Sequence, residues 1–108
     1  METNVITINK FFKLKRLALI FAYVVIKYNT TKNPVLPNEI AQYYNISHKQ
    51  VLGYIKKLDD SGYTKRPKDT CPRPISPTEE GRKMYNDKIS AFFSRREQRS
   101  IKRHSILE

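Results

Sequence analysis

The side chains best suited to chemistry lie in the stretch SHKQVLGYIKKLDDSGY, residues 47–63. Ser47 and Gln50 have the S-x-x-Q spacing of a capping box, which predicts that a helix begins here. Gly62 predicts where the helix ends, because glycine accepts the left-handed conformation that closes many helices. The polar side chains in between include three lysines, a histidine and a glutamine, which suit the recognition of a charged partner.

Residues 48–60 have two distinct faces when they are placed on a helical wheel at about 100° per residue. One arc is apolar and contains Val51, Tyr54, Ile55 and Leu58. The opposite arc contains Lys49, Gly53, Lys56 and Asp60, with Gln50 and Lys57 alongside. We expect the apolar arc to pack on the protein and the opposite arc to meet a partner.

This polar face has the donors that a helix uses in the major groove of DNA, where its first residues meet base edges. Lys49 can donate to guanine, and Gln50 can pair with adenine. His48 can reach a base or a phosphate. Lys56 and Lys57 are better placed for phosphates.

Gly53 is the unusual residue of this face, because glycine inside a helix costs about 1 kcal/mol relative to alanine. Without a side chain there, the helix axis can approach the groove floor or a phosphate more closely. The alternative is that Gly53 is a tolerated weak position on a solvated face. We favour close approach, because lysines and a helix cap accompany the glycine.

The composition agrees with a polyanionic partner. The 108 residues include 21 Lys and Arg but only 10 Asp and Glu, a net charge of +11. Such an excess indicates nucleic acid or an anionic membrane surface. The excess is spread along the whole chain, and no single amphipathic helix collects it with exposed aromatics, so we expect no membrane partner.

Signals of other functions are weak. The three glycines are scattered, so no phosphate-binding loop or dinucleotide fingerprint is present. Cys71, His48 and His104 lack the spacing of metal ligands. We therefore predict a protein that is not an enzyme and needs neither cofactor nor metal. A single cysteine, Cys71, allows no intramolecular disulfide, which indicates a reducing, cytoplasmic compartment and an incidental thiol. With DNA as the partner, we expect the protein to be associated with the nucleoid.

The remaining elements must position this helix. Dense apolar residues from Lys10 to Tyr28 predict a helix that is buried on several sides, as a central helix or a dimer seam. Its most apolar run, residues 17–26, is too short for a membrane span, which takes about 20 residues. A short helix that starts near Pro37 and ends at Asn45 leads into the capped helix, so residues 38–61 have helix-turn-helix spacing.

The second half of the chain predicts a hairpin and a further helix. Residues 63–77 form two strands around a basic tip rich in proline, which suits an edge hairpin. Thr78 caps a helix that continues to about residue 104, with basic residues crowded into its later turns. Residues 1–108 are thus expected to form one domain, mainly α with a small β-hairpin (α+β).

The run LPNEIAQYYNISHKQVLGYIKKLDDSGYTKR resembles the helix-turn-helix of winged-helix transcription regulators of the MarR-like type, and TEEGRKMY resembles the start of the helix after the wing. The resemblance covers roughly residues 35–90. It implies a winged helix-turn-helix with a long C-terminal helix. Pro37, Pro77 and the wing sequence PKDTCPRP depart from that pattern.

The resemblance implies DNA contacts by His48, Lys49, Gln50 and Gly53, and backbone contacts by Arg66, Lys68 and Arg73 in the wing. The full predicted site is Ser47, His48, Lys49, Gln50, Gly53, Lys56, Lys57, Arg66, Lys68 and Arg73. The partner would be double-stranded DNA, bound by a homodimer that pairs through Lys10–Tyr28 and the C-terminal helix. The C-terminal helix could instead pack on its own domain. The other functions left open are a plasmid partition adaptor and an RNA- or protein-binding winged helix.

Overall fold

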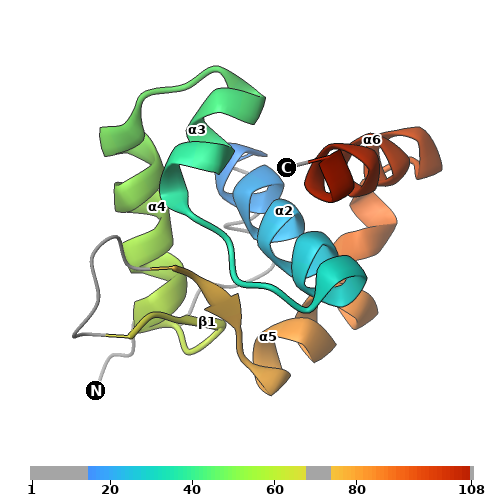
Figure 1. Ribbon diagram of the computed structural model, residues 1–108. Coiled ribbons are helices and arrows are strands. Elements are labelled where there is room, and N and C mark those ends of the chain that lie inside the picture. Colours follow the sequence, from blue (N-terminus) through green and yellow to red (C-terminus); the bar gives the residue numbers. More distant parts are fainter. Residues whose placement is uncertain (1–14, 68–73, 108) are drawn as a thin grey trace.

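The computed structural model describes residues 15–67 and 74–107, which form a mostly helical structure with a small antiparallel sheet (Figure 1). In chain order the elements are α2 (Lys15–Thr31), α3 (Pro37–Tyr44), α4 (His48–Asp60), β1 (Thr64–Lys65), β2 (Ser76–Pro77), α5 (Glu79–Met84), the π-helix η1 (Tyr85–Ile89), the 3₁₀-helix η2 (Ser90–Phe92) and α6 (Arg95–Leu107). The expectation of a mainly α structure with a small hairpin is confirmed. No helix of this described part is long and apolar enough to cross a bilayer.

Helix α2 is the centre of the structure, with α4 on one side and α6 on the other (Figure 1). Every residue from Ile20 to Val25 is buried, which is more than one face of a helix. The predicted burial on several sides is therefore confirmed as a central helix. The predicted end at Tyr28 is wrong, because α2 continues to Thr31. Lys32 then ends it in the left-handed conformation, with a φ of 62°.

An ion pair joins α2 to α3. The Lys27 ammonium lies 2.6 and 2.7 Å from the two carboxylate oxygens of Glu39, and both side chains are about nine-tenths buried. The Tyr23 hydroxyl donates to the same carboxylate at 2.6 Å. Because a buried charge without its partner is costly, these contacts fix where α3 sits along α2.

The turn between α3 and α4 forms as the local residues dictate. Pro37 begins α3, where its missing N–H is not needed. Asn45 ends α3 in the left-handed conformation, at φ 57°, and its backbone N–H bonds the Ala41 carbonyl. Ser47 then caps α4 by accepting from the Gln50 N–H at 3.1 Å. After α4, Gly62 has a φ of 83°, as its predicted role as the helix stop requires.

The sheet contains β1 and β2, with Thr64 opposite Pro77 and Lys65 opposite Ser76. Val35, in the segment before α3, adds a single antiparallel bridge to Ile75 through two hydrogen bonds of 2.7 and 2.8 Å. The hairpin is thereby held against the core. Its tip, residues 68–73, lies outside the described residues.

The start of α5 is attached closely to the end of α4. The Thr78 hydroxyl accepts from the Gly81 N–H at 2.9 Å and donates to the Gly62 carbonyl at 2.7 Å. The Thr78 N–H bonds the Tyr63 carbonyl at 3.0 Å. Gly81 faces this same carbonyl, and a Cβ at position 81 would lie 2.0 Å from the oxygen. Glycine is therefore required there by the close approach of two backbones.

The predicted continuous helix over residues 78–104 is wrong. After η2 the chain is extended at Phe93, with φ −112° and ψ 139°, and α6 begins afresh. The cause is a capping box that the sequence analysis missed. The Ser94 hydroxyl accepts from the Glu97 N–H at 3.1 Å, and the Glu97 carboxylate accepts from the Ser94 N–H at 2.9 Å.

The break allows α6 to fold back onto α2 of the same chain (Figure 1). Ile101 and Ser105 of α6 are buried at this contact. The His104 ring packs against Tyr43, with centroids 4.7 Å apart, and the Tyr43 hydroxyl shares a 2.7 Å hydrogen bond with Ser100. The inner face of α6 is thus occupied within one chain.

We predict that Gly81→Ala lowers the free energy of unfolding by about 1–3 kcal/mol, because the added methyl group forces the backbone of Tyr63 away. Gly53→Ala is the matched control. A Cβ at position 53 meets no atom of the described residues within 4 Å, so this change should raise stability by about 0.5–1 kcal/mol. Urea denaturation of both variants measures the difference. A Gly81→Ala protein as stable as the wild type would contradict the close packing of these two segments.

Candidate nucleic-acid interface

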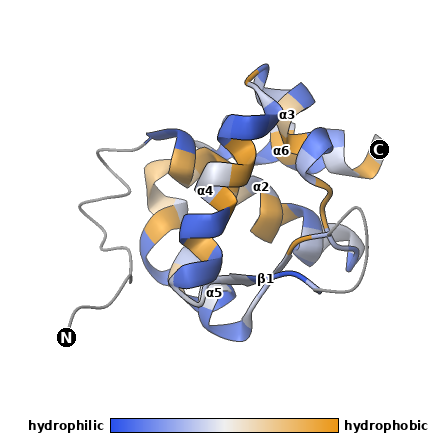
Figure 2. Ribbon diagram, turned by 90° about the vertical axis from the view of Figure 1, so that its left-hand side faces the viewer, coloured by the Kyte–Doolittle hydropathy of each residue, from blue (hydrophilic) through white to orange (hydrophobic). Residues whose placement is uncertain are grey.

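The predicted residues on α4 and its cap lie together on one outward surface. All of them are exposed: Ser47, His48, Lys49, Gln50, Gly53, Lys56 and Lys57. The side of the molecule that carries α4 faces the viewer in Figure 2, where hydrophilic and hydrophobic residues alternate along the helix. Val51, Ile55 and Leu58 are fully buried against the core. The two faces of the helical wheel are confirmed, whereas the partner of the outer face stays a prediction.

The first turn of α4 has a neighbour that the sequence analysis missed. Only the serine half of the predicted capping box forms, because the Gln50 side chain accepts a 3.4 Å hydrogen bond from the Arg16 guanidinium. Arg16 is exposed at the start of α2 and adds a cation beside the N-terminus of α4. The sequence carries no signal for this contact, because the pairing of Arg16 with Gln50 depends on the tertiary fold.

Both halves of α4 carry exposed lysines on this surface. Within the described part of the chain, Lys49 forms no ion pair, and the helix dipole adds positive potential at this end. Toward the C-terminus, Lys56 lies 3.5 Å from Asp60. The first turn of α4, which would meet base edges, therefore has uncompensated charge, and Lys57 in the later turns also forms no ion pair among the described residues.

Gly53 is exposed in the middle of this surface, and the fold does not require a glycine there. Its backbone is helical, and the space that a Cβ would fill is open. Close packing within the chain explains Gly81 but gives no reason for Gly53. The glycine leaves a shallow point on the outer face, which is what close approach of a partner to the backbone requires.

Leu52 was not among the predicted site residues, although it lies beside Lys56 on the outer face. Its side chain is 37% exposed, one of the few exposed large apolar side chains in the described residues. In the major groove an apolar side chain can contact the methyl group of thymine. Helical periodicity already places Leu52 outside the apolar arc, so the signal was present in the sequence.

The described part of the hairpin is less accessible for contacts with a DNA backbone than the sequence predicted. The Arg66 guanidinium donates to Asp59 of α4 at 2.7 Å, and its side chain is only 14% exposed. The Thr64 hydroxyl donates to the other oxygen of Asp59 at 2.5 Å. Arg66 thus holds the hairpin against α4. Lys68, Arg73 and Cys71 lie outside the described residues.

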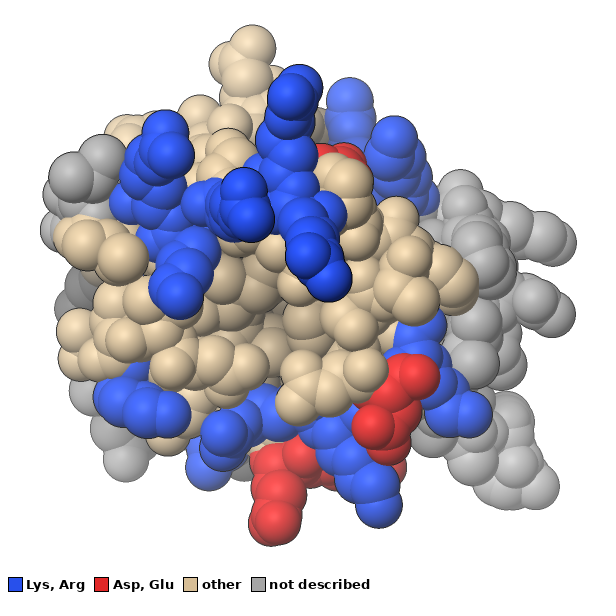
Figure 3. All heavy atoms as spheres, turned by 90° about the vertical axis from the view of Figure 1, so that its right-hand side faces the viewer, with Lys and Arg blue, Asp and Glu red and all other residues tan. Residues whose placement is uncertain are grey.

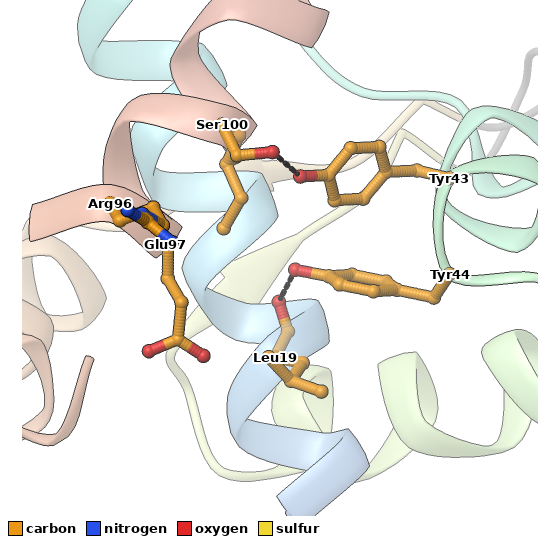
Figure 4. Close-up of a pocket in the computed structure, with 7 residues that line it drawn as sticks. Leu19, Tyr43, Tyr44, Arg96, Glu97 and Ser100 are labelled. Atoms are coloured by element: carbon orange, nitrogen blue, oxygen red, sulfur yellow. Dashed lines mark hydrogen bonds between the residues drawn. The ribbon is translucent and has the colours of Figure 1, made fainter. Parts of the chain in front are cut away.

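A separate cavity of about 560 Å³ opens between α2, α3 and α6 (Figure 4). It is lined by Leu19, Tyr43, Tyr44, Arg96, Glu97, Ser100 and Ile101, none of which belongs to the predicted site. The Tyr44 hydroxyl donates to the Leu19 carbonyl at 2.8 Å. Burial raises the pKa of Tyr44 far above its ordinary value, so this hydroxyl stays protonated and keeps its bond.

No protein-family model matches the chain, and no curated protein is significantly similar to it. Among residues 15–67 and 74–107, no group of three or more His, Cys, Asp or Glu side chains is placed to hold a metal ion. The assignment of a function therefore depends on the surface of α4 and on the distribution of charge.

We predict that Arg66→Gln lowers the free energy of unfolding by about 1–3 kcal/mol, because a charge-assisted bond to a half-buried carboxylate is lost. Lys56→Gln removes the same charge from an exposed pair and should cost less than about 0.5 kcal/mol. Urea denaturation compares the two variants. Equal stabilities would show that Arg66 does not hold the hairpin.

Proposed function

We propose that this protein is a sequence-specific regulator that binds double-stranded DNA, with a winged helix-turn-helix made by α3, α4 and the hairpin. In this proposal α4 enters the major groove. The single observation that carries it is the outer face of α4, where every predicted donor is exposed around a glycine that the fold does not need. The cap at Ser47 and the net charge of +11 add support.

The roles of individual residues follow from their positions on the helix. Lys49 and Gln50, in the first turn, are nearest to the base edges and supply the direct contacts. Arg16, bound to Gln50, is placed beside them for a phosphate. Lys57 lies further along the helix, where it suits the DNA backbone. Arg66 acts through Asp59, by setting the angle between the hairpin and α4.

Binding as a homodimer is part of the proposal. Within one chain α6 already covers α2, so a homodimer through these elements exchanges α6 between copies. A two-fold dimer would bind a palindromic operator with half-sites about one helical turn apart. The solution mass, measured alone and with DNA, tests this part separately from DNA binding itself.

Footprinting on a duplex enriched from a random pool tests the proposal, with two matched lysine variants. Lys49→Ala should reduce the preference for the enriched sequence, at about 1–3 kcal/mol for a specific base contact. Lys57→Ala should weaken binding to all sequences alike and reduce the salt slope by about one unit. Absence of any protected site in the wild type, or stronger binding to RNA than to duplex DNA at matched salt, would overturn the proposal.

Gly53 supplies an independent test of which face meets DNA. Gly53→Glu should abolish duplex binding while the fold survives, because the side chain extends into open space and places a carboxylate against phosphates. Asn86→Glu, at an exposed position of η1, changes the net charge equally and should bind DNA nearly as the wild type does. Full binding by Gly53→Glu, with an unchanged circular dichroism spectrum, would mean that another face contacts DNA.

A further inference from the structure

Helix α6 has a second basic surface that is separate from α4. Its five cations are exposed: Arg95, Arg96, Arg99, Lys102 and Arg103. At the helical period they fall within an arc of about 120°, opposite the buried Ile101 and Ser105. We call this arc the α6 basic face. Glu97, the single acid of α6, lies outside the arc and caps Ser94.

The α6 basic face is uncompensated within the described structure. None of its five side chains forms an ion pair among residues 15–67 and 74–107. Figure 3 looks at the side of the molecule where α6 lies, and Lys and Arg side chains gather over the upper part of this view. The face is about 12 Å long from Arg95 to Arg103, at about 1.5 Å per residue. Alongside one DNA strand it would pass about three or four phosphates, at one per about 3.4 Å.

This face does not adjoin the outer face of α4. The two helices lie on opposite sides of α2, and each directs its buried residues toward the core (Figure 1). A duplex in contact with α4 would have to turn around a molecule of 43 × 35 × 26 Å to reach α6. Bending a site of 20–30 base pairs by only 40–90° already costs about 1–6 kcal/mol. One duplex therefore cannot readily contact both faces.

We propose that the α6 basic face binds the phosphate backbone of a second DNA segment, so that one protein molecule bridges two duplexes. This inference rests on the proposed function of α4. A row of cations can bind the phosphates of any duplex, so the second contact needs no particular base sequence. The polar and aromatic contacts of Ser100 and His104 hold α6 rigidly and keep the row facing outward.

An anionic membrane is the competing partner for a basic helix. An interfacial helix places a broad apolar face into the lipid boundary. The apolar residue Ile101 of α6 is instead buried in the protein. Among the side chains of α6 that the structure describes, Ile106 is the one large apolar residue that is exposed. The exposed chemistry of α6 is therefore that of a phosphate-binding surface.

A bridging assay tests the proposal. One duplex that carries the footprinted site is fixed to beads, and retention of a second, fluorescent duplex is measured as protein is added. Arg99→Gln combined with Lys102→Gln removes two charges from the α6 basic face. Lys83→Gln combined with Lys88→Gln removes two exposed charges from α5 and η1 and is the matched control.

We expect the α6 variant to keep specific binding of a single duplex and to lose bridging by more than about tenfold at 0.15 M salt, as the loss of two phosphate contacts predicts. The control variant should bridge like the wild type. Equal bridging by the two variants would overturn the proposal. A homodimer that holds one duplex on the α4 of each copy would give that result without any contact by α6. The proposal would also be overturned if the α6 variant lost binding to phosphatidylserine vesicles but still bridged two duplexes as the wild type does.

The assay also separates the two proposals of function. A wild-type protein that protects a site on a single duplex but never retains the second duplex overturns the role of α6 alone. A wild-type protein that binds no duplex overturns both. The Gly53→Glu variant completes the comparison, because it should lose the footprint on the single duplex while its α6 basic face is intact.

Discussion

The structure depends first on the need to cover α2 on every side. A helix whose residues from Ile20 to Val25 are all buried cannot lie at the surface of a small protein, so the other elements must surround it. Helices α4 and α6 pack on opposite sides of α2, and β2 and η1 also contact α2. The apolar faces of α4 and α6 are then buried against α2. Mainly their polar faces remain outside, and because Lys and Arg outnumber Asp and Glu by 21 to 10, these exposed surfaces are basic.

Within this arrangement the position of α4 is set by polar contacts at its two ends as well as by the packing of its apolar face. The buried pair of Lys27 and Glu39 determines how α3 lies on α2. Because only a short turn through Asn45 joins α3 to α4, the orientation of α3 also constrains that of α4. At its other end α4 is held by Asp59, which binds both Thr64 and Arg66 of the hairpin. A helix fixed at both ends can present donors in a defined geometry, which base recognition requires.

The sequence predicted features that depend on a few neighbouring residues and missed those that depend on distant contacts. The caps at Ser47 and Thr78 and the helix stop at Gly62 formed as their local chemistry requires. The break before α6 was missed although Ser94 and Glu97 have capping-box spacing, because apolar residues continue at helical spacing across it. The pairing of Arg66 with Asp59 depends on how tightly the chain turns at Gly62, which residue patterns do not reveal.

The net charge indicates a polyanionic partner but does not say which cations would meet it. In the described part of the structure the cations fall into two groups, those that have a carboxylate partner and those that have none. Lys27, Lys56 and Arg66 form ion pairs within the chain, and two of these pairs are largely buried and hold elements together. The cations at the N-terminal half of α4 and along α6 have no such partner in the described residues. Each exposed cation without a carboxylate partner can attract phosphate through its uncompensated charge, and these two opposite surfaces each gather several such cations.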